Sequence, residues 1–204
     1  MAHLPDGILA APVLVAGASV ALAGTAIGLK RLDPDRIPQA GVLSALFFVG
    51  SLVHFPVGPG SVHLLLNGLV GIMLGWAAFP AILVALTLQA LMFGFGGLVV
   101  LGVNVMNMAV PAVLCGLVFS SVIRARPAWC CVAAGLCAAA AVAMSASGMA
   151  LSLAASGQEF SAAAKLALIS HLPVMAIEAV FTGAVVGLLR KVRPESLALS
   201  PGAA

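Results

Sequence analysis

Hydrophobic residues run along this chain in long stretches, and short polar or turn-forming segments separate them. A helix that crosses a bilayer needs about 20 mainly apolar residues. That length predicts seven membrane-spanning helices, at Ile8–Leu29, Ile37–His54, Val62–Ala78, Pro80–Leu101, Asn104–Ile123, Trp129–Ala155 and Ala164–Leu189. Only Phe79 and the helix-starting Pro80 mark the boundary between the third and the fourth, and the sixth is long enough to tilt or break near Gly148. The pattern predicts an all-α, polytopic membrane protein.

The composition supports this prediction and excludes a soluble globule. Hydrophobic residues make up 63% of the chain and charged residues only 7%, against roughly 25% charged residues in soluble domains. We interpret residues 1–204 as one transmembrane domain in the lipid bilayer, with a metal-binding N-terminal segment at 1–7, a helical bundle at 8–190 and a tail at 191–204. The cysteines lie in apolar stretches without zinc-like spacing, and we interpret them as small packing residues: Cys115, Cys130, Cys131 and Cys137.

The basic residues predict the orientation in the membrane. They follow the first, fifth and seventh predicted helices, at Lys30, Arg31, Arg36, Arg124, Arg126, Arg190, Lys191 and Arg193. The positive-inside rule then places the N-terminus outside and the C-terminus in the cytoplasm of a bacterial inner membrane, with only Lys165 outside. This topology, and not nucleic-acid binding, accounts for the net charge of +3. The first 29 residues contain no Lys or Arg, so no cleavable signal peptide is expected.

The first seven residues, Met1-Ala2-His3-Leu4-Pro5-Asp6-Gly7, can chelate a metal ion. A free terminal amine, the following amide nitrogens and an imidazole can close five- and six-membered rings around one ion. Such nitrogen-rich environments suit Ni(II) and Cu(II), and strong nitrogen donors also hold Co(II). His3 is therefore a candidate metal ligand.

A second candidate lies next to a turn between the second and third predicted helices. The loop Phe55–Ser61 contains Pro-Val-Gly-Pro-Gly, whose turn chemistry brings the flanking His54 and His63 toward each other. We expect His63 to bind the metal and His54 to line the site. Asn67 follows His63 by four residues and is expected on the same helix face.

Several polar residues inside the apolar stretches have two possible roles. Gly94, Gly96 and Gly97 predict a chain break, after which Asn104 and Asn107 either line the site or join helices, the role we favour for Gln89. Small residues four apart, such as Gly17 and Ala21 or Gly24 and Gly28, form either internal packing or a docking face.

Glu178 is the single carboxylate predicted within the membrane, and His171 lies two turns before it. A carboxylate at that depth must face the bundle or be protonated. The two residues either support or gate the metal site, or form a buried hydrogen bond that fixes helix packing.

Four segments together resemble the CbiM/NikM family. They are the opening His-Leu-Pro-Asp-Gly, the run Gly60-Ser61-Val62-His63-Leu64, the run from Phe95-Gly96-Gly97 through Leu101-Gly102-Val103-Asn104 to Asn107-Met108, and His171-Leu172-Pro173 through Glu178. The resemblance covers nearly the whole chain in the same order. It implies a seven-helix substrate-specific component of an energy-coupling-factor cobalt or nickel transporter.

The resemblance also implies the ligand set. In the family, the terminal amine, the amide and imidazole of a histidine at position two, and a second histidine hold the metal. Carried over, the imidazoles belong to His3 and His63, and Ala2 supplies the amine once Met1 is removed. If Met1 stays, the amine, two amides and one imidazole fill four positions without His63.

The resemblance implies cytoplasmic ATPase subunits, a coupling transmembrane subunit and a small accessory membrane subunit as partners. The chain lacks a phosphate-binding Gly-x-x-x-x-Gly-Lys-Ser/Thr loop, so we expect that it cannot energise transport alone. As a transport component it is expected to be no enzyme and to carry no cofactor, only the transported Ni²⁺ or Co²⁺, while the partner subunits hydrolyse ATP. Two alternatives stay open: a proton-coupled secondary transporter that uses Glu178, and a membrane-embedded enzyme that uses His171 and Glu178. The sequence does not choose between nickel and cobalt, although the Pro-Asp-Gly after His3 favours nickel by resemblance.

Overall fold

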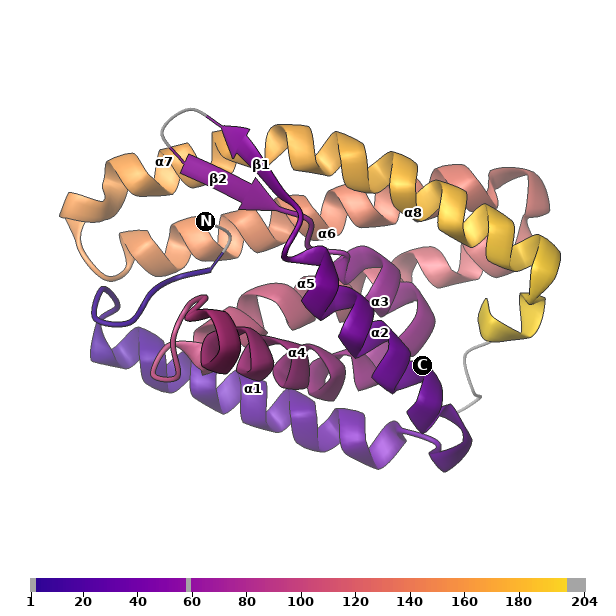
Figure 1. Ribbon diagram of the computed structural model, residues 1–204, viewed down its shortest axis with the longest axis horizontal. Coiled ribbons are helices and arrows are strands. Elements are labelled where there is room, and N and C mark those ends of the chain that lie inside the picture. Colours follow the sequence, from indigo (N-terminus) through magenta and orange to yellow (C-terminus); the bar gives the residue numbers. More distant parts are fainter. Residues whose placement is uncertain (1–2, 58–59, 198–204) are drawn as a thin grey trace.

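The computed structural model describes residues 3–57 and 60–197, with the side chains of residues 55–57, 60 and 61 left out. The helices run mainly along the long axis of the molecule (Figure 1). The α-helices are α1 (Ala11–Arg31), α2 (Ile37–Gly50), α3 (Asn67–Leu74), α4 (Ala78–Phe93), α5 (Leu101–Ala125), α6 (Cys130–Ala154), α7 (Ser161–Ser170) and α8 (Leu172–Val192). Short 3-10 turns connect several of them: η1 (Pro34–Arg36), η2 (Gly75–Ala77), η3 (Pro127–Trp129), η4 (Gln158–Phe160) and η5 (Pro194–Leu197). The predicted all-α fold is confirmed.

Several of these segments are long and apolar enough to cross a bilayer. Within the described residues they are Ala11–Arg31, Asn67–Phe93, Leu101–Ala125, Pro127–Ala154 and Gln158–Val192. The chain is therefore a multi-pass membrane protein, as its composition predicted.

The predicted Val62–Ala78 helix is wrong at its start. Residues Gly60–His63 form strand β2, which pairs with β1 (His54–Val57), and the helix begins only at Asn67. His63 and Asn67 therefore do not share a helix face. Since His54 belongs to the hairpin, α2 ends at Gly50 instead of continuing to His54.

Two further predicted helices have different bounds for local reasons. The fourth ends at Phe93, because Gly94 takes a left-handed conformation with φ +66°, which stops an α-helix. The seventh is interrupted at His171, where α7 ends and α8 begins. Pro173 lies in the first turn of α8, the position at which a helix tolerates proline.

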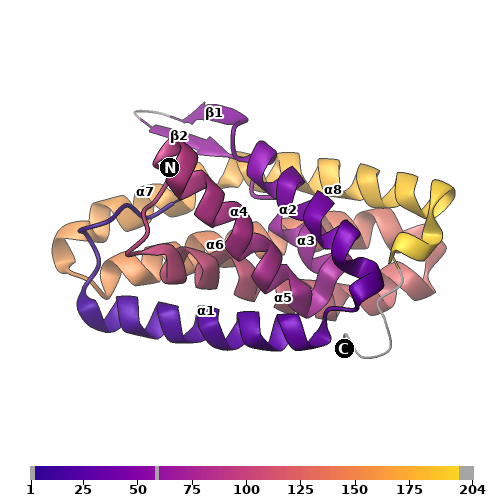
Figure 2. The same cartoon turned by 60° about the horizontal axis from the view of Figure 1, so that its bottom comes forward.

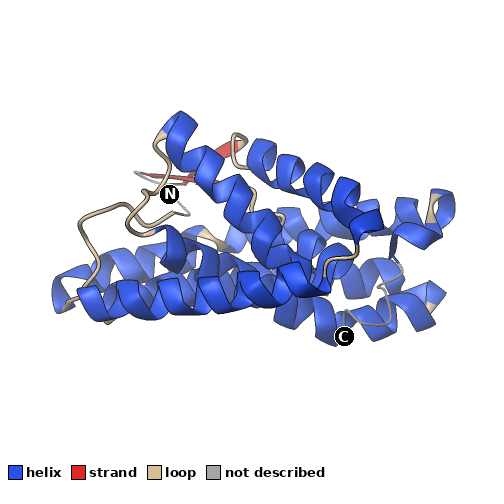
Figure 3. Ribbon diagram, turned by 90° about the horizontal axis from the view of Figure 1, so that it is seen from below, coloured by secondary structure: helices blue, strands red, loops and turns tan. Residues whose placement is uncertain are grey.

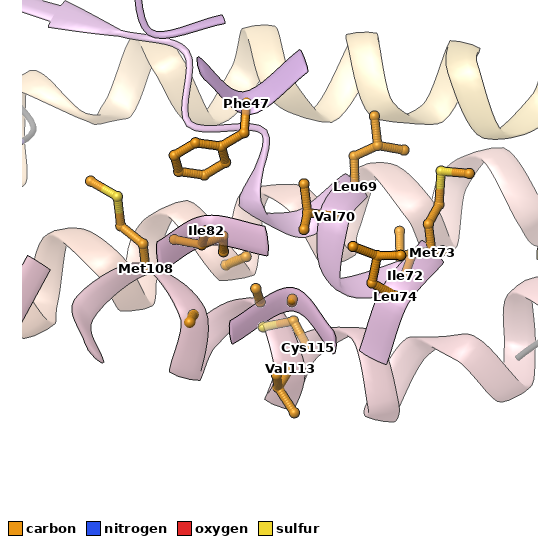
Figure 4. Packing of buried hydrophobic residues seen from close by; sticks show 14 of the residues in the cluster. Phe47, Leu69, Val70, Ile72, Met73, Leu74, Ile82, Met108, Val113 and Cys115 are labelled. Carbon is orange, nitrogen blue, oxygen red and sulfur yellow. The ribbon is translucent and has the colours of Figure 1, made fainter. Parts of the chain in front are cut away.

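Helix α3 lies at the centre of the bundle. All eight of its residues are buried, which explains why this segment is apolar on every side. Figure 4 shows the α3 side chains among residues of α2, α4 and α5. The labelled residues of this cluster are Phe47, Leu69, Val70, Ile72, Met73, Leu74, Ile82, Met108, Val113 and Cys115.

Glycines let the helices approach closely. The buried residues of α1 are the small residues of the predicted stripe, Gly17, Ala21, Gly24 and Gly28. A Cβ at Gly28 would lie 2.5 Å from the Trp76 carbonyl oxygen. The stripe is therefore internal packing, which decides between the two roles left open by the sequence.

Three of the four cysteines are buried, and all four are free thiols. Cys115, Cys130 and Cys137 fit the expected packing role, whereas Cys131 is exposed. Cys131 nevertheless lies beside α8, because a Cβ at Gly187 would be 2.6 Å from its Sγ.

One end of the bundle gathers segments that are distant in the sequence. We call it the hairpin end: it contains residues 3–7, the β1–β2 hairpin and the loop 94–100. The N-terminal segment runs back from α1 to lie beside β2 in two views (Figures 1 and 2). Figure 3, seen from below, shows the same segment next to the strands and the last turn of α4.

Candidate metal site

Two buried imidazoles lie face to face at the hairpin end. His3 is 5% exposed and His63 is 2% exposed. Their ring centroids are 4.7 Å apart, with an angle of 25° between the ring planes. Among the described residues, neither ring nitrogen of His3 has a hydrogen-bond partner, and Nε2 of His63 has none either. Buried polar atoms are normally paired, so these three nitrogens point to a ligand.

A hydrogen bond fixes the tautomer of His63. Its Nδ1 lies 2.8 Å from the carbonyl oxygen of Leu64, and a carbonyl can only accept. Nδ1 therefore carries the proton, and the lone pair is on the unpaired Nε2. A metal-binding histidine usually has this arrangement, with its second ring nitrogen bonded to a carbonyl or carboxylate.

Burial keeps both imidazoles neutral. It lowers the pKa of His63 to about 4, against the opposing effect of the bond to Leu64, and His54 and His171 lower it further. Burial, followed by the nearby His63, lowers the pKa of His3 well below its ordinary value. A metal ligand must be deprotonated, and these rings need lose no proton at neutral pH.

The hairpin brings His54 to the site, as its turn chemistry predicted. The strand register pairs His54 with His63, and their ring centroids are 5.8 Å apart. His54 is exposed, and its Nδ1 lies 3.0 Å from the Leu52 carbonyl oxygen. His54 therefore lines the exposed side of the His3–His63 pair.

Phe95 was not predicted as a site residue. Its ring stacks on that of His3 with the ring centroids 6.2 Å apart, and it meets the His54 ring edge to face with the centroids 5.5 Å apart. The signal in the sequence was an aromatic residue among the glycines Gly94, Gly96 and Gly97. Gly96 has φ +76°, and a Cβ there would lie 3.4 Å from the Cβ of His3.

The N-terminal segment is anchored to the start of α5. Asn104 accepts a hydrogen bond from the Leu4 N–H (3.0 Å) and donates one to the Leu4 carbonyl (3.1 Å). Asp6 Oδ1 accepts from the Val100 N–H at 3.0 Å, where a carboxylate satisfies a free amide at a helix start. These bonds hold His3 against His63.

The other candidate amides join helices. Asn67 donates to Ser145 Oγ (2.8 Å) and the Met108 carbonyl (3.3 Å). Asn107 donates to Ser152 Oγ at 3.3 Å, which joins α5 to α6. Gln89 is fully buried, and neither polar atom of its side chain has a partner; the helix-joining role expected of it lacks a hydrogen bond.

His171 and Glu178 bond to different groups. His171 Nδ1 lies 2.6 Å from the Ala167 carbonyl oxygen. Glu178 Oε1 accepts from the Leu66 N–H at 2.8 Å and also from the Leu65 N–H. His171 therefore bonds to the end of α7, whereas Glu178 supports the Leu65–Leu66 backbone before α3.

The described side chains alone do not make a complete metal site. Among residues 3–54 and 62–197, no group of three or more His, Cys, Asp or Glu side chains is placed to hold an ion. Backbone nitrogens would have to complete the donor set of His3 and His63. The expected amine donor, Ala2, lies outside the described residues.

Comparisons with known proteins agree with a transport role. Residues 3–196 match the family described as "CbiM: Cobalt uptake substrate-specific transmembrane region". The chain is 42% identical to a Haemophilus influenzae protein named "Putative metal transport protein", over 95% of each chain. It is 38% identical to the "Fused nickel transport protein NikMN" of Rhodobacter capsulatus, over 53% of this chain and 33% of that one. A solved "transition metal transporter" has the same fold, with a TM-score of 0.77 over 93% of each chain at 24% identity.

Proposed function

This chain belongs to the CbiM family, and on that premise we propose that it captures nickel or cobalt ions for an ATP-driven energy-coupling-factor importer. The single observation that carries the proposal is the stacked, buried pair His3 and His63, in which three ring nitrogens lack a hydrogen-bond partner among the described residues. The proposed location is a bacterial inner membrane, with the hairpin end outside.

The proposed donor set is rich in nitrogen. It consists of the imidazoles of His3 and His63, the amide nitrogen of His3 and the amine of Ala2. Nitrogen donors in a fixed geometry suit Ni²⁺ and Co²⁺, and geometry, more than affinity, rejects other divalent ions. Two contacts supply that geometry. Asn104 of α5 bonds to Leu4, and Asp6 bonds to Val100 just before α5, so the N-terminal segment is fixed to the start of α5 at two points.

Capture alone moves no ion across the membrane. The ion sheds its water as it enters a site lined by Phe95 and the two buried rings. We propose that cytoplasmic ATPase subunits drive its release through a coupling membrane subunit, together with a small accessory membrane subunit. The fused nickel transport protein among the relatives supports such partners, because its name joins a related chain to a second transport component.

Uptake of radioactive nickel or cobalt tests this function in cells that carry the partner subunits. His3→Ala and His63→Ala should each abolish uptake, whereas His54→Ala, which removes the exposed imidazole 5.8 Å from His63, should retain most of it. Normal uptake in both of the first two variants would overturn the proposal. Uptake that survives ATP depletion but stops when the proton gradient collapses would show a secondary transporter instead.

Metal analysis of the purified protein identifies the ion, and an intact mass identifies the first residue. A mass that retains Met1 would argue against the amine of Ala2 as a ligand. Competition between nickel and cobalt for the same site then decides between the two ions.

A further inference from the structure

Glu178 bonds to a backbone segment next to the proposed capture site. It lies within α8 and is fully buried. Its Oε1 accepts hydrogen bonds from two consecutive backbone amides, those of Leu65 and Leu66, more than 100 residues away in the sequence. Hydrogen bonds to a carboxylate in a low-dielectric interior are among the stronger ones in proteins.

The segment that Glu178 holds comes directly after the proposed ligand His63. It links strand β2 to helix α3, and its first residue, Leu64, provides the carbonyl that accepts the His63 Nδ1–H. The carboxylate, the Leu64–Leu66 backbone and the imidazole therefore form one connected series of hydrogen bonds from α8 to the metal site.

This segment has an unfavourable backbone conformation. Leu66 has φ +54°, and it is the single non-glycine residue with positive φ among the described residues. A left-handed conformation is unfavourable for an L-amino acid, because it brings Cβ too close to the following carbonyl oxygen. It allows the chain to turn sharply from the strand into α3 and directs two successive N–H groups at one oxygen of Glu178.

The turn depends on Glu178 more than α3 does. Asn67, the first residue of α3, has its own bonds to Ser145 and to the Met108 carbonyl. Leu65 and Leu66 precede the helix, and their N–H groups would be buried without partners if the carboxylate were removed. An unsatisfied buried amide is unfavourable, so the turn would rearrange while the helix stays in place.

We infer that Glu178 is a positioning residue for metal capture. It fixes the Leu64–Leu66 turn, which holds the Leu64 carbonyl against Nδ1 of His63 and leaves Nε2 free to bind the ion. This inference rests on the proposed function, since it assigns Glu178 a role that acts through His63.

The test measures nickel and cobalt affinity of the purified full chain in detergent by titration calorimetry. Partners of metal ligands typically contribute 10- to 100-fold to affinity. Glu178→Ala should therefore weaken binding by roughly 10- to 100-fold, and Glu178→Gln, which keeps an acceptor oxygen, should lose less. Thr182→Val is the matched control, because Thr182 is fully buried one turn further along α8 and its Oγ1 has no partner.

The same substitutions in a His63→Ala background separate positioning from general stability. If Glu178 acts through His63, Glu178→Ala should change the affinity of the His63→Ala protein by less than about threefold, an interaction that double-mutant cycles detect. Equal losses in both backgrounds, or wild-type affinity in Glu178→Ala and Glu178→Gln, would overturn the inference. If Glu178→Ala does not fold, Glu178→Gln provides the comparison.

The ligand-field spectrum of bound Ni²⁺ or Co²⁺ gives a second readout that a merely structural role would not change. At saturating metal, the bands should shift in the Glu178 variants and match the wild type in Thr182→Val. Wild-type affinity in His63→Ala would count against the proposed function itself. A weakened His63→Ala with unchanged Glu178 variants would count against the positioning role alone.

Discussion

The side chain of Asn104 binds the backbone of Leu4 at both of its polar atoms. Its Oδ1 accepts from the Leu4 N–H at 3.0 Å, and its Nδ2 donates to the Leu4 carbonyl at 3.1 Å. Both residues are buried. The amide thus imitates a strand partner for the residue that follows His3.

Replacing Asn104 should loosen the N-terminal segment and weaken metal binding. We expect Asn104→Ala to raise the dissociation constant for nickel or cobalt by about 10-fold or more, the effect typical of residues that hold a metal ligand in place. Asn107→Ala is the control, because Asn107 bonds to Ser152 instead. Calorimetry on both purified variants makes the comparison, and equal affinities would show that the Leu4 anchor does not position His3.

The contact between Asp6 and Gly97 predicts a steric effect. A Cβ at Gly97 would overlap the Asp6 carboxyl group, which accepts the Val100 N–H at the start of α5. Gly97→Ala should displace Asp6 and with it the N-terminal segment, so both the melting temperature and the metal affinity should fall. An unchanged melting temperature together with unchanged affinity would contradict this contact.

The metal-free protein should lose stability as the pH falls through the range between the unfolded and folded pKa values of His63. Its ordinary pKa is about 6.5, and burial lowers it to about 4 in the folded protein. Between these values the unfolded chain takes up a proton that the folded chain does not, so the free energy of unfolding decreases as the pH falls. The full loss from His63 is on the order of 3 kcal/mol.

Melting temperatures of the metal-free protein in detergent, between pH 7 and pH 4, measure this dependence. His63→Gln removes the titrating group and should flatten the pH dependence. A profile as steep as that of the wild type would assign the effect to other groups.

Packing of α3 against α5 should tolerate no added methyl group. A Cβ at Gly71 would overlap the Ala112 carbonyl, and a Cβ at Gly116 would overlap the Gly71 carbonyl. Gly116→Ala should therefore destabilise the bundle by about 1–3 kcal/mol, the usual cost of overpacking. Gly41→Ala, where no atom lies within 4 Å of the added Cβ, should be neutral or slightly stabilising. Thermal unfolding of the two variants side by side checks the difference.

The sequence predicted the features that depend on local composition. Long apolar runs predicted helices corresponding to α1, α5 and α6, because the width of the bilayer sets the length of an apolar run. Turn chemistry predicted the approach of His54 and His63, which the strand register confirms. The chelating N-terminus selected His3 and the turn next to the third predicted helix selected His63, and the structure brings their rings together.

The sequence did not reveal where α3 begins. An apolar run that is buried in protein has the same sequence pattern as one that faces lipid, so the pattern predicts one spanning helix across β2 and the eight-residue α3. Only the surrounding helices, which bury α3 on all sides, distinguish the two.

The tertiary structure alone decided which groups hold the site in place. The bonds of Asn104 to Leu4, of Asp6 to Val100 and of Glu178 to Leu66 each join residues 94 to 112 positions apart. Residue type showed that Asn104 and Glu178 need partners, because unpaired polar groups are costly within the membrane. Which backbone amides become those partners depends on helix packing, since only the folded chain places a carboxylate against the amides of Leu65 and Leu66 before α3 and of Val100 before α5.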